Sequence, residues 1–178
     1  MENIIITISK VEDVWGIQDV YYKSWLATYP NNKYGITVDD IEHRFRDRFT
    51  QETIDKRKQA ILNPDPNFKI FIAKDNDKVV GVCRVELLPE KNQLRTIYLL
   101  PEYFGKGIGT KLWKQAQKVF DPNKDIYVEV VTYNKRAIEF YKKLGFVDTG
   151  KRLVDERFKM KSGAIFPEME MVIRVGEK

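Results

Sequence analysis

The stretch LLPEYFGKGIGTKLW, at residues 99–113, limits the fold more than any other part of this sequence. It carries glycine at every second position, at Gly105, Gly107 and Gly109, and it joins an apolar extended run to a run with helical periodicity. Glycine accepts backbone conformations and close approaches that other residues do not. The stretch therefore predicts a strand, a turn and a helix. The glycines either shape the turn or leave bare backbone open to a ligand.

Composition and charge indicate a globular domain with a mixed surface. The chain has 178 residues, of which 43% are hydrophobic and 32% charged. Its net charge is +5, but the basic residues are interleaved with 26 acidic ones. We therefore expect one domain over residues 1–178 and no nucleic-acid partner.

The residues that are scarce in this chain exclude several kinds of site. Cys83 is the only cysteine and His43 the only histidine, which argues against a disulfide, a resident metal and a histidine-based triad. Cys83 lies in an apolar run, so we expect it to be a buried, inert thiol. The first residues lack the layout of a signal peptide, and no apolar run is long enough to span a membrane. We expect a cytoplasmic protein without a membrane partner, and we leave open whether it forms a homodimer.

Apolar periodicity and turn residues divide the chain into alternating elements. Strands are predicted at residues 3–9, 68–74, 78–88, 92–100, 126–133, 145–154 and 168–175. Helices are predicted at residues 11–27, 38–49, 50–62, 107–120 and 135–144. The order β-ααα-βββ-α-β-α-ββ predicts an α/β fold of the α+β type, with a single mixed, mostly antiparallel sheet flanked by helices.

The glycine stretch does not match two common phosphate-binding patterns. A Walker loop requires lysine directly after its last glycine, but here Thr110 separates Gly109 from Lys111. The spacing of the dinucleotide fingerprint G-x-G-x-x-G fails at its third glycine. A backbone anion site at a helix N-terminus remains, with Lys106 and Lys111 adding positive charge. A turn without a ligand is the alternative.

Two adjoining motifs carry a resemblance to a known family. The phrase LRTIYLLPEYFGKGIGTKLW resembles the coenzyme-A-binding segment of the GCN5-related N-acetyltransferases (GNAT). Gly107 and Gly109 match the two small positions of that segment, whereas Phe104 stands where the family has Gln or Arg. The phrase VEVVTYNKRAIEFYKKLGFVDTG resembles the next family motif. Its matching residues are Asn134, Ala137, Tyr141, Gly145 and Phe146. The resemblance covers roughly residues 68–150.

Membership would imply an acyl-CoA N-acyltransferase fold and direct transfer of an acetyl group from acetyl-CoA to an amine, without a metal. The coenzyme contacts implied by position are Ile97, Tyr98, Leu99, Gly105, Lys106, Gly107, Ile108, Gly109, Thr110, Asn134, Ala137 and Tyr141. The backbone N–H of Leu99 would polarise the thioester, and Tyr141 would protonate the leaving thiolate. Glu129 is expected to be the base that deprotonates the amine. Glu86 is its rival, and both could act through water.

The acceptor is the part least determined by the sequence. Helices near the N-terminus usually cover the acceptor side of this fold, which nominates Trp25, Tyr29, Tyr34 and Phe166 as aromatic contacts for an alkyl ammonium group. We expect a small-molecule amine, of polyamine or amino-acid type. One alternative is a protein N-terminus or lysine side chain, and another is a non-catalytic coenzyme-A-binding regulatory domain.

Overall fold

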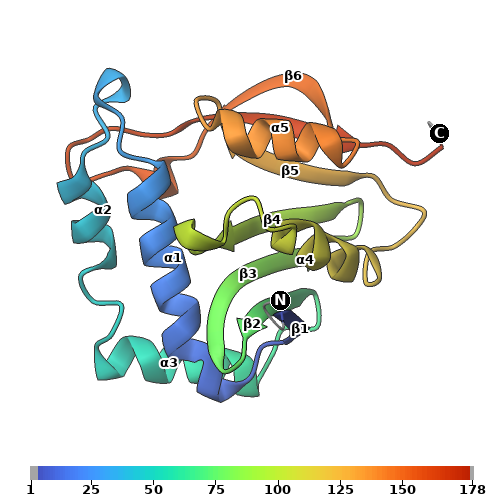
Figure 1. Cartoon of the computed structure of the whole chain (residues 1–178). Helices are drawn as coiled ribbons and strands as arrows, with labels where there is room; N and C mark the ends of the chain where they lie inside the picture. The colour runs from blue at the N-terminus through green and yellow to red at the C-terminus, as the bar shows by residue number, and fades with distance from the viewer. Residues whose placement is uncertain (1–3, 177–178) are drawn as a thin grey trace.

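The structure, a computed structural model that describes residues 4–176, contains a mixed seven-stranded sheet with the order β1-β2-β3-β4-β5-β7-β6 (Figure 1). Its strands are β1 (Ile4–Ile8), β2 (Phe68–Asp75), β3 (Lys78–Leu87), β4 (Asn92–Leu99), β5 (Ile126–Val131), β6 (Val147–Val154) and β7 (Pro167–Ile173). Its helices are α1 (Val14–Thr28), α2 (Val38–Phe45), α3 (Gln51–Leu62), α4 (Ile108–Gln117) and α5 (Lys135–Lys143). Short 3-10 turns are η1 (Val11–Asp13), η2 (Asn32–Tyr34), η3 (Pro101–Tyr103) and η4 (Glu156–Phe158). The predicted order of elements and the mixed, mostly antiparallel sheet are confirmed.

The predicted helix at residues 38–49 is wrong in its length, because α2 ends at Phe45. Arg48 provides the reason. Its guanidinium donates to the carbonyl of Phe45 at 2.9 Å and stacks 3.7 Å from the ring centroid of Tyr22 on α1. The last carbonyls of a helix need such partners. These contacts of Arg48 favour a non-helical turn after Phe45 over a further helical turn of α2.

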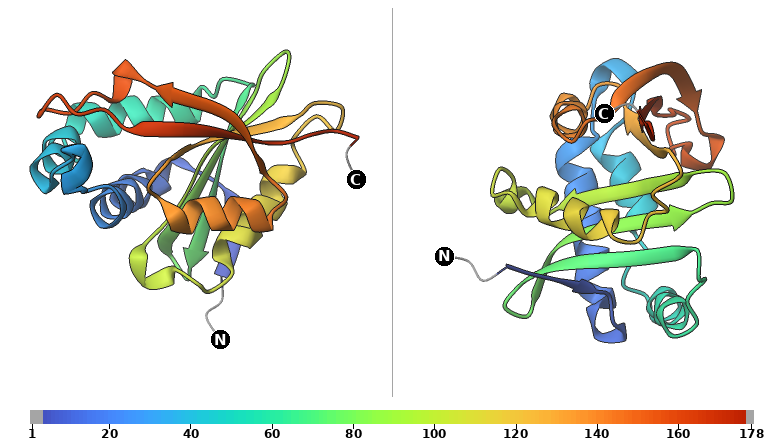
Figure 2. Two further views of the ribbon diagram at one scale, coloured as in Figure 1. Left: turned by 90° about the horizontal axis from the view of Figure 1, so that it is seen from above. Right: turned by 90° about the vertical axis from the view of Figure 1, so that its right-hand side faces the viewer.

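The helices lie on both faces of the sheet. A Cβ atom added at Gly81 of β3 would lie 3.2 Å from Leu112 of α4, so Gly81 faces α4. The next residue, Val82, faces the other way and is paired with Tyr98, whose ring packs edge-on against Tyr21 of α1. Accordingly, Figure 2 shows α4 and α5 on one side of the sheet and α3 on the other.

Two clusters of buried side chains hold these layers together. The larger one fills the space between the sheet and its helices and includes Cys83. Cys83 is buried, as predicted, and this burial raises the pKa of its thiol to about 12. The described part of the chain has no helix with both the length and the apolar character needed to cross a membrane.

The second cluster joins α1 and α2 to the segment before β7. Its buried members are Trp25, Tyr29, Ile36, Ile41, Val131, Met160 and Phe166. Asp40 fixes the junction, because its carboxylate accepts hydrogen bonds from the backbone N–H of Ser162 at 2.7 Å and from Thr37. Burial alone would raise the pKa of Asp40, but these hydrogen bonds outweigh it and lower the pKa to about 2.

Candidate active site

The two central strands, β4 and β5, separate along their length. Their parallel pairing covers only Asn92–Leu94 and Ile126–Val128. Beyond it β4 continues to Leu99 and β5 to Val131, each without a partner in the other strand. A parting of two strands leaves unpaired N–H and C=O groups along both edges, which an extended ligand can use.

The backbone at the end of β4 points the predicted oxyanion donor into this opening. Leu100 donates its N–H to the carbonyl of Val80, in the direction of β3, at 2.9 Å. Successive N–H groups of a strand point to opposite edges, so the N–H groups of Leu99 and Ile97 are directed away from β3. The backbone N–H and carbonyl groups of Tyr98 point toward β3 instead. Its side chain lies on the α1 face, where its hydroxyl is 2.9 Å from that of Tyr29.

The glycine stretch forms the turn between η3 and α4. Gly105 and Gly107 adopt left-handed φ angles of 76° and 75°, and within residues 4–176 no atom outside the adjoining residues lies within 4 Å of a Cβ added at either. The first backbone hydrogen bond of α4 runs from Lys111 N–H to the carbonyl of Gly107 at 3.1 Å. The N–H groups before it, from residue 108 to residue 110, therefore have no partner within the helix. Uncrowded glycines beside such N–H groups suit an anion such as a diphosphate.

Gly109 has a different role from the other two glycines. A Cβ atom at this position would lie 3.2 Å from the ring of Phe140 on α5 and 3.8 Å from Ile97 on β4. The side chain of Ile108 is buried in the core, while Lys106 and Thr110 are exposed beside the turn. Two glycines thus shape the turn, and the third lets α5 approach it closely.

Replacing Gly107 by alanine is expected to lower the free energy of unfolding by about 1 kcal/mol, because alanine strains at a φ angle of 75°. Urea denaturation measures this change. Thr110→Ala is the matched control, since Thr110 is exposed in the first turn of α4. If both variants unfold at the same urea concentration, the left-handed conformation of Gly107 contributes nothing to stability.

Helix α5 contributes the second group of predicted residues. Asn134 caps it by accepting a hydrogen bond from the backbone N–H of Ala137 at 3.2 Å. Tyr141, two turns further along, is 6% exposed and packs edge-on against Phe146. Burial raises the pKa of Tyr141, and the nearby Tyr98 adds to this effect. The phenol therefore stays protonated at neutral pH, as a proton donor must.

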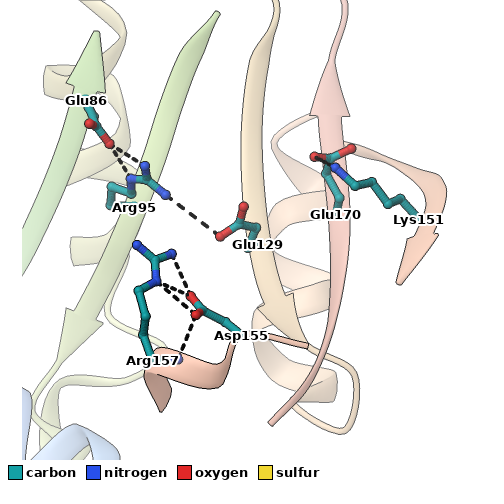
Figure 3. A network of polar contacts seen from close by, with 7 residues as sticks. All are labelled: Glu86, Arg95, Glu129, Lys151, Asp155, Arg157 and Glu170. Atoms are coloured by element: carbon teal, nitrogen blue, oxygen red, sulfur yellow. Dashed lines mark hydrogen bonds and ion pairs between the residues drawn. The ribbon is translucent and has the colours of Figure 1, made fainter. Parts of the chain in front are cut away.

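The two candidate bases share one arginine (Figure 3). Arg95 of β4 contacts one carboxylate oxygen of Glu86 through both Nε and Nη2 at 2.5 Å. It lies 3.9 Å from Glu129 of β5 through Nη1. The side chain of Glu86 is 13% exposed and that of Glu129 is 32% exposed. Glu86 is thus held by a charged partner, whereas Glu129 keeps more of its carboxylate free.

Comparison with known proteins shows to which family this site belongs. The sequence profile of the acetyltransferase (GNAT) family matches residues 19–146, which is most of the chain. The chain belongs to this family. The matched region contains the strand opening, the glycine turn and Tyr141.

Three GNAT proteins illustrate the range of similarity. The spermidine N(1)-acetyltransferase of Thermoplasma acidophilum is 26% identical over 141 residues, which are 76% of this chain and 83% of that protein. The N-alpha-acetyltransferase 30 of Schizosaccharomyces pombe is 31% identical over 88 residues, 46% of this chain and 58% of that protein. The crystal structure of the PaiA N-acetyltransferase from T. acidophilum in complex with coenzyme A superimposes with a TM-score of 0.64 at 22% identity, covering 94% of this chain and 98% of the other.

A cavity of about 200 Å³ in this GNAT chain borders Glu129. Its lining residues are Glu129, Leu153, Val154, Asp155, Arg157 and Glu168. Glu168 was not predicted from the sequence. Burial raises the pKa of Glu168 to about 7, and the negative charges of Glu129 and Asp155 add to this effect. The positive charge of Arg157 partly opposes it. The only signal in the sequence is the alternation of acidic and apolar residues in EMEMVIRV.

Replacing Glu168 by glutamine is expected to stabilise the protein at pH 8 and to leave its stability unchanged at pH 4. The folded-state pKa of Glu168, about 7, lies above the ordinary value of 4.5, so its contribution to stability is lost as the pH rises through that window. Because the side chain is partly exposed, we expect a gain of about 1–2 kcal/mol in the free energy of unfolding. Urea denaturation at both pH values measures it, with the exposed Glu156→Gln as control. Parallel pH profiles for native and variant protein would contradict the raised pKa.

The predicted acceptor residues lie together on the α1 face of this GNAT fold. Trp25, Tyr29 and Phe166 are buried in the second cluster, with Trp25 and Phe166 at a ring-centroid distance of 5.6 Å. Tyr34 is only partly buried and stacks on Tyr133 at 4.9 Å. Three of the four thus serve as packing residues, and their contact with an acceptor stays a prediction.

Proposed function

We propose that this protein transfers an acetyl group from acetyl-CoA to the primary amine of a small molecule. The parting of β4 and β5 beside the glycine turn carries this proposal, because it offers a backbone-lined slot next to an anion site. A diphosphate with an extended thioester arm fits both parts. The arm would bind along the free edge of β4 at Ile97 and Leu99.

Three chemical steps fall to residues along the opening. The N–H of Leu99 would stabilise the negative charge that develops on the thioester oxygen. The Tyr141 hydroxyl would give its proton to the sulfur as the carbon–sulfur bond breaks. The amine must lose a proton before or during its attack, because a lysine-like amine is charged at neutral pH. Glu129 would accept that proton.

The choice of Glu129 over Glu86 depends on their partners. Glu86 has two short contacts with Arg95, and protonating it would give up this charged pair. Among the residues that the structure describes, the ion pair of Glu129 is the longer contact of 3.9 Å with Arg95, and Glu129 opens onto the cavity. Glu168 borders the same cavity, so a proton taken by Glu129 would have a second carboxylate nearby to receive it.

The small-molecule acceptor is supported by the coverage of the relatives. The spermidine acetyltransferase aligns with 76% of this chain, whereas the N-alpha-acetyltransferase aligns with 46%. A cationic amine also suits a cavity with three carboxylates and one arginine.

Release of free thiol from acetyl-CoA tests the proposal, with polyamines, amino acids and peptides offered as acceptors and the products weighed by mass spectrometry. We expect a product of added acetyl mass with at least one free amine. Acetylation of peptides alone would make the protein a peptide or protein acetyltransferase. Binding of coenzyme A without any turnover would indicate a regulatory domain.

A further inference from the structure

The glycine turn lacks the polar side chain found at the corresponding position of the GNAT coenzyme-A-binding segment. Position 104, where the pattern has Gln or Arg, is occupied by Phe104. A phenyl ring offers no N–H to a phosphate oxygen. The backbone N–H groups of the turn and the lysines at positions 106 and 111 remain, but a planar guanidinium group at this edge has to come from another element.

Arg136 brings a guanidinium group to this position. Its Cζ atom lies 3.7 Å from the ring centroid of Phe104, which is close stacking. Arg136 is in the first turn of α5, and Phe140 is one turn further along the same face. Phe140 packs where Gly109 leaves room, so this face of α5 rests on the glycine turn through two separate contacts.

The charge of Arg136 is available to a ligand. Within residues 4–176, no carboxylate lies in ion-pair distance of its guanidinium, whereas Arg152 of β6 is paired with Asp148 at 2.8 Å. Stacking on a ring uses the face of the guanidinium and leaves its in-plane N–H groups free. These can bind two phosphate oxygens at once, in a geometry that a lysine cannot match.

We propose that Arg136, held by stacking on Phe104, binds the diphosphate of coenzyme A and replaces the side chain missing at position 104. The assignment rests on the proposed function, because it requires that the turn binds this coenzyme. Phe104 then acts as a positioning residue that orients Arg136. The opposite possibility is that the pair only attaches α5 to the turn, in which case its loss changes stability and not the response to phosphate groups.

Isothermal titration calorimetry with coenzyme A, dephospho-coenzyme A and pantetheine separates these roles. We expect Arg136→Ala to lower the affinity for coenzyme A and for dephospho-coenzyme A alike by roughly 10- to 100-fold, the range for charge-assisted hydrogen bonds. Pantetheine, which has no diphosphate, should bind the variant as it binds the native protein. Lys135→Ala is the matched control, because Lys135 is the exposed neighbour on the same helix, and it should change affinity less than threefold.

A second substitution tests the replacement itself. In the Arg136→Ala background, Phe104→Arg should restore most of the lost affinity for coenzyme A, since it returns the guanidinium to the position where the pattern has one. Arg136→Lys should recover only part of it, because lysine keeps the charge without the planar fork. Thermal unfolding of each variant verifies that it is folded.

Each result decides the inference. Three outcomes would overturn it. The first is an affinity of Arg136→Ala for coenzyme A within threefold of the native value, and the second is a loss with coenzyme A that is absent with dephospho-coenzyme A. The third is no recovery of affinity in the double variant Arg136→Ala, Phe104→Arg. If the native protein itself binds no coenzyme A, the proposed function fails together with the inference. If the native protein binds and Arg136→Ala binds equally well, only the inference fails.

Discussion

Tyr141→Phe is expected to lower kcat by roughly 10²- to 10³-fold while leaving the affinity for coenzyme A within about threefold, because a positioned general acid contributes on this scale. The substitution removes only the hydroxyl. The ring contacts with Phe140 and Phe146 remain, so the core should keep its packing. Steady-state kinetics give kcat, and calorimetry gives the affinity.

In the proposed role, the phenol would keep its proton until the carbon–sulfur bond breaks. Burial raises the pKa of Tyr141, so the hydroxyl is neutral throughout the working range and carries a proton to give. Tyr127→Phe is the matched control, because Tyr127 lies on β5 in the paired part of the strand. A Tyr141→Phe variant with native turnover would remove Tyr141 from the reaction, whatever its packing role.

Glu129→Gln is expected to lower kcat at pH 7 by roughly 10²-fold, and the loss should shrink as the pH rises. Without a base, only the amine that is already uncharged can react. That fraction rises about tenfold per pH unit below an amine pKa near 10. The native rate should flatten over the same range, so the two profiles converge toward pH 9.

Glu86→Gln distinguishes the two candidate bases. Glu86 is held by Arg95 in two short contacts, so its loss should reduce kcat less than tenfold and without the recovery at high pH. The exposed Glu156→Gln serves as the control for a change of surface charge. If Glu86→Gln shows the larger loss and the recovery with pH, the base is Glu86.

Local features of the sequence predicted much of this protein. Turn residues and periodicity were enough to order the strands and helices, because each such signal acts over a few residues. The cap at Asn134 and the left-handed turn at Gly105 and Gly107 follow from the preferences of single residues.

The features that the sequence did not predict depend on contacts between distant segments. Glu168 comes beside Glu129 because β7 inserts between β5 and β6, which the order of elements does not reveal. The end of α2 at Phe45 depends on Arg48 stacking against α1. The stacking of Arg136 on Phe104 likewise joins two elements that are separated by a helix and a strand.

The second hydrophobic cluster has a consequence for how the acceptor side of this fold can vary from one protein to another. The residues assigned to the coenzyme lie in one continuous block from β4 to α5, whereas the cluster is assembled from residues 25–41 and 158–166 with Val131, closed by the Asp40–Ser162 hydrogen bond. If the acceptor binds at this cluster, substitutions in those two outer segments would alter the acceptor side and reach the coenzyme side through the hydroxyl contact between Tyr29 and Tyr98.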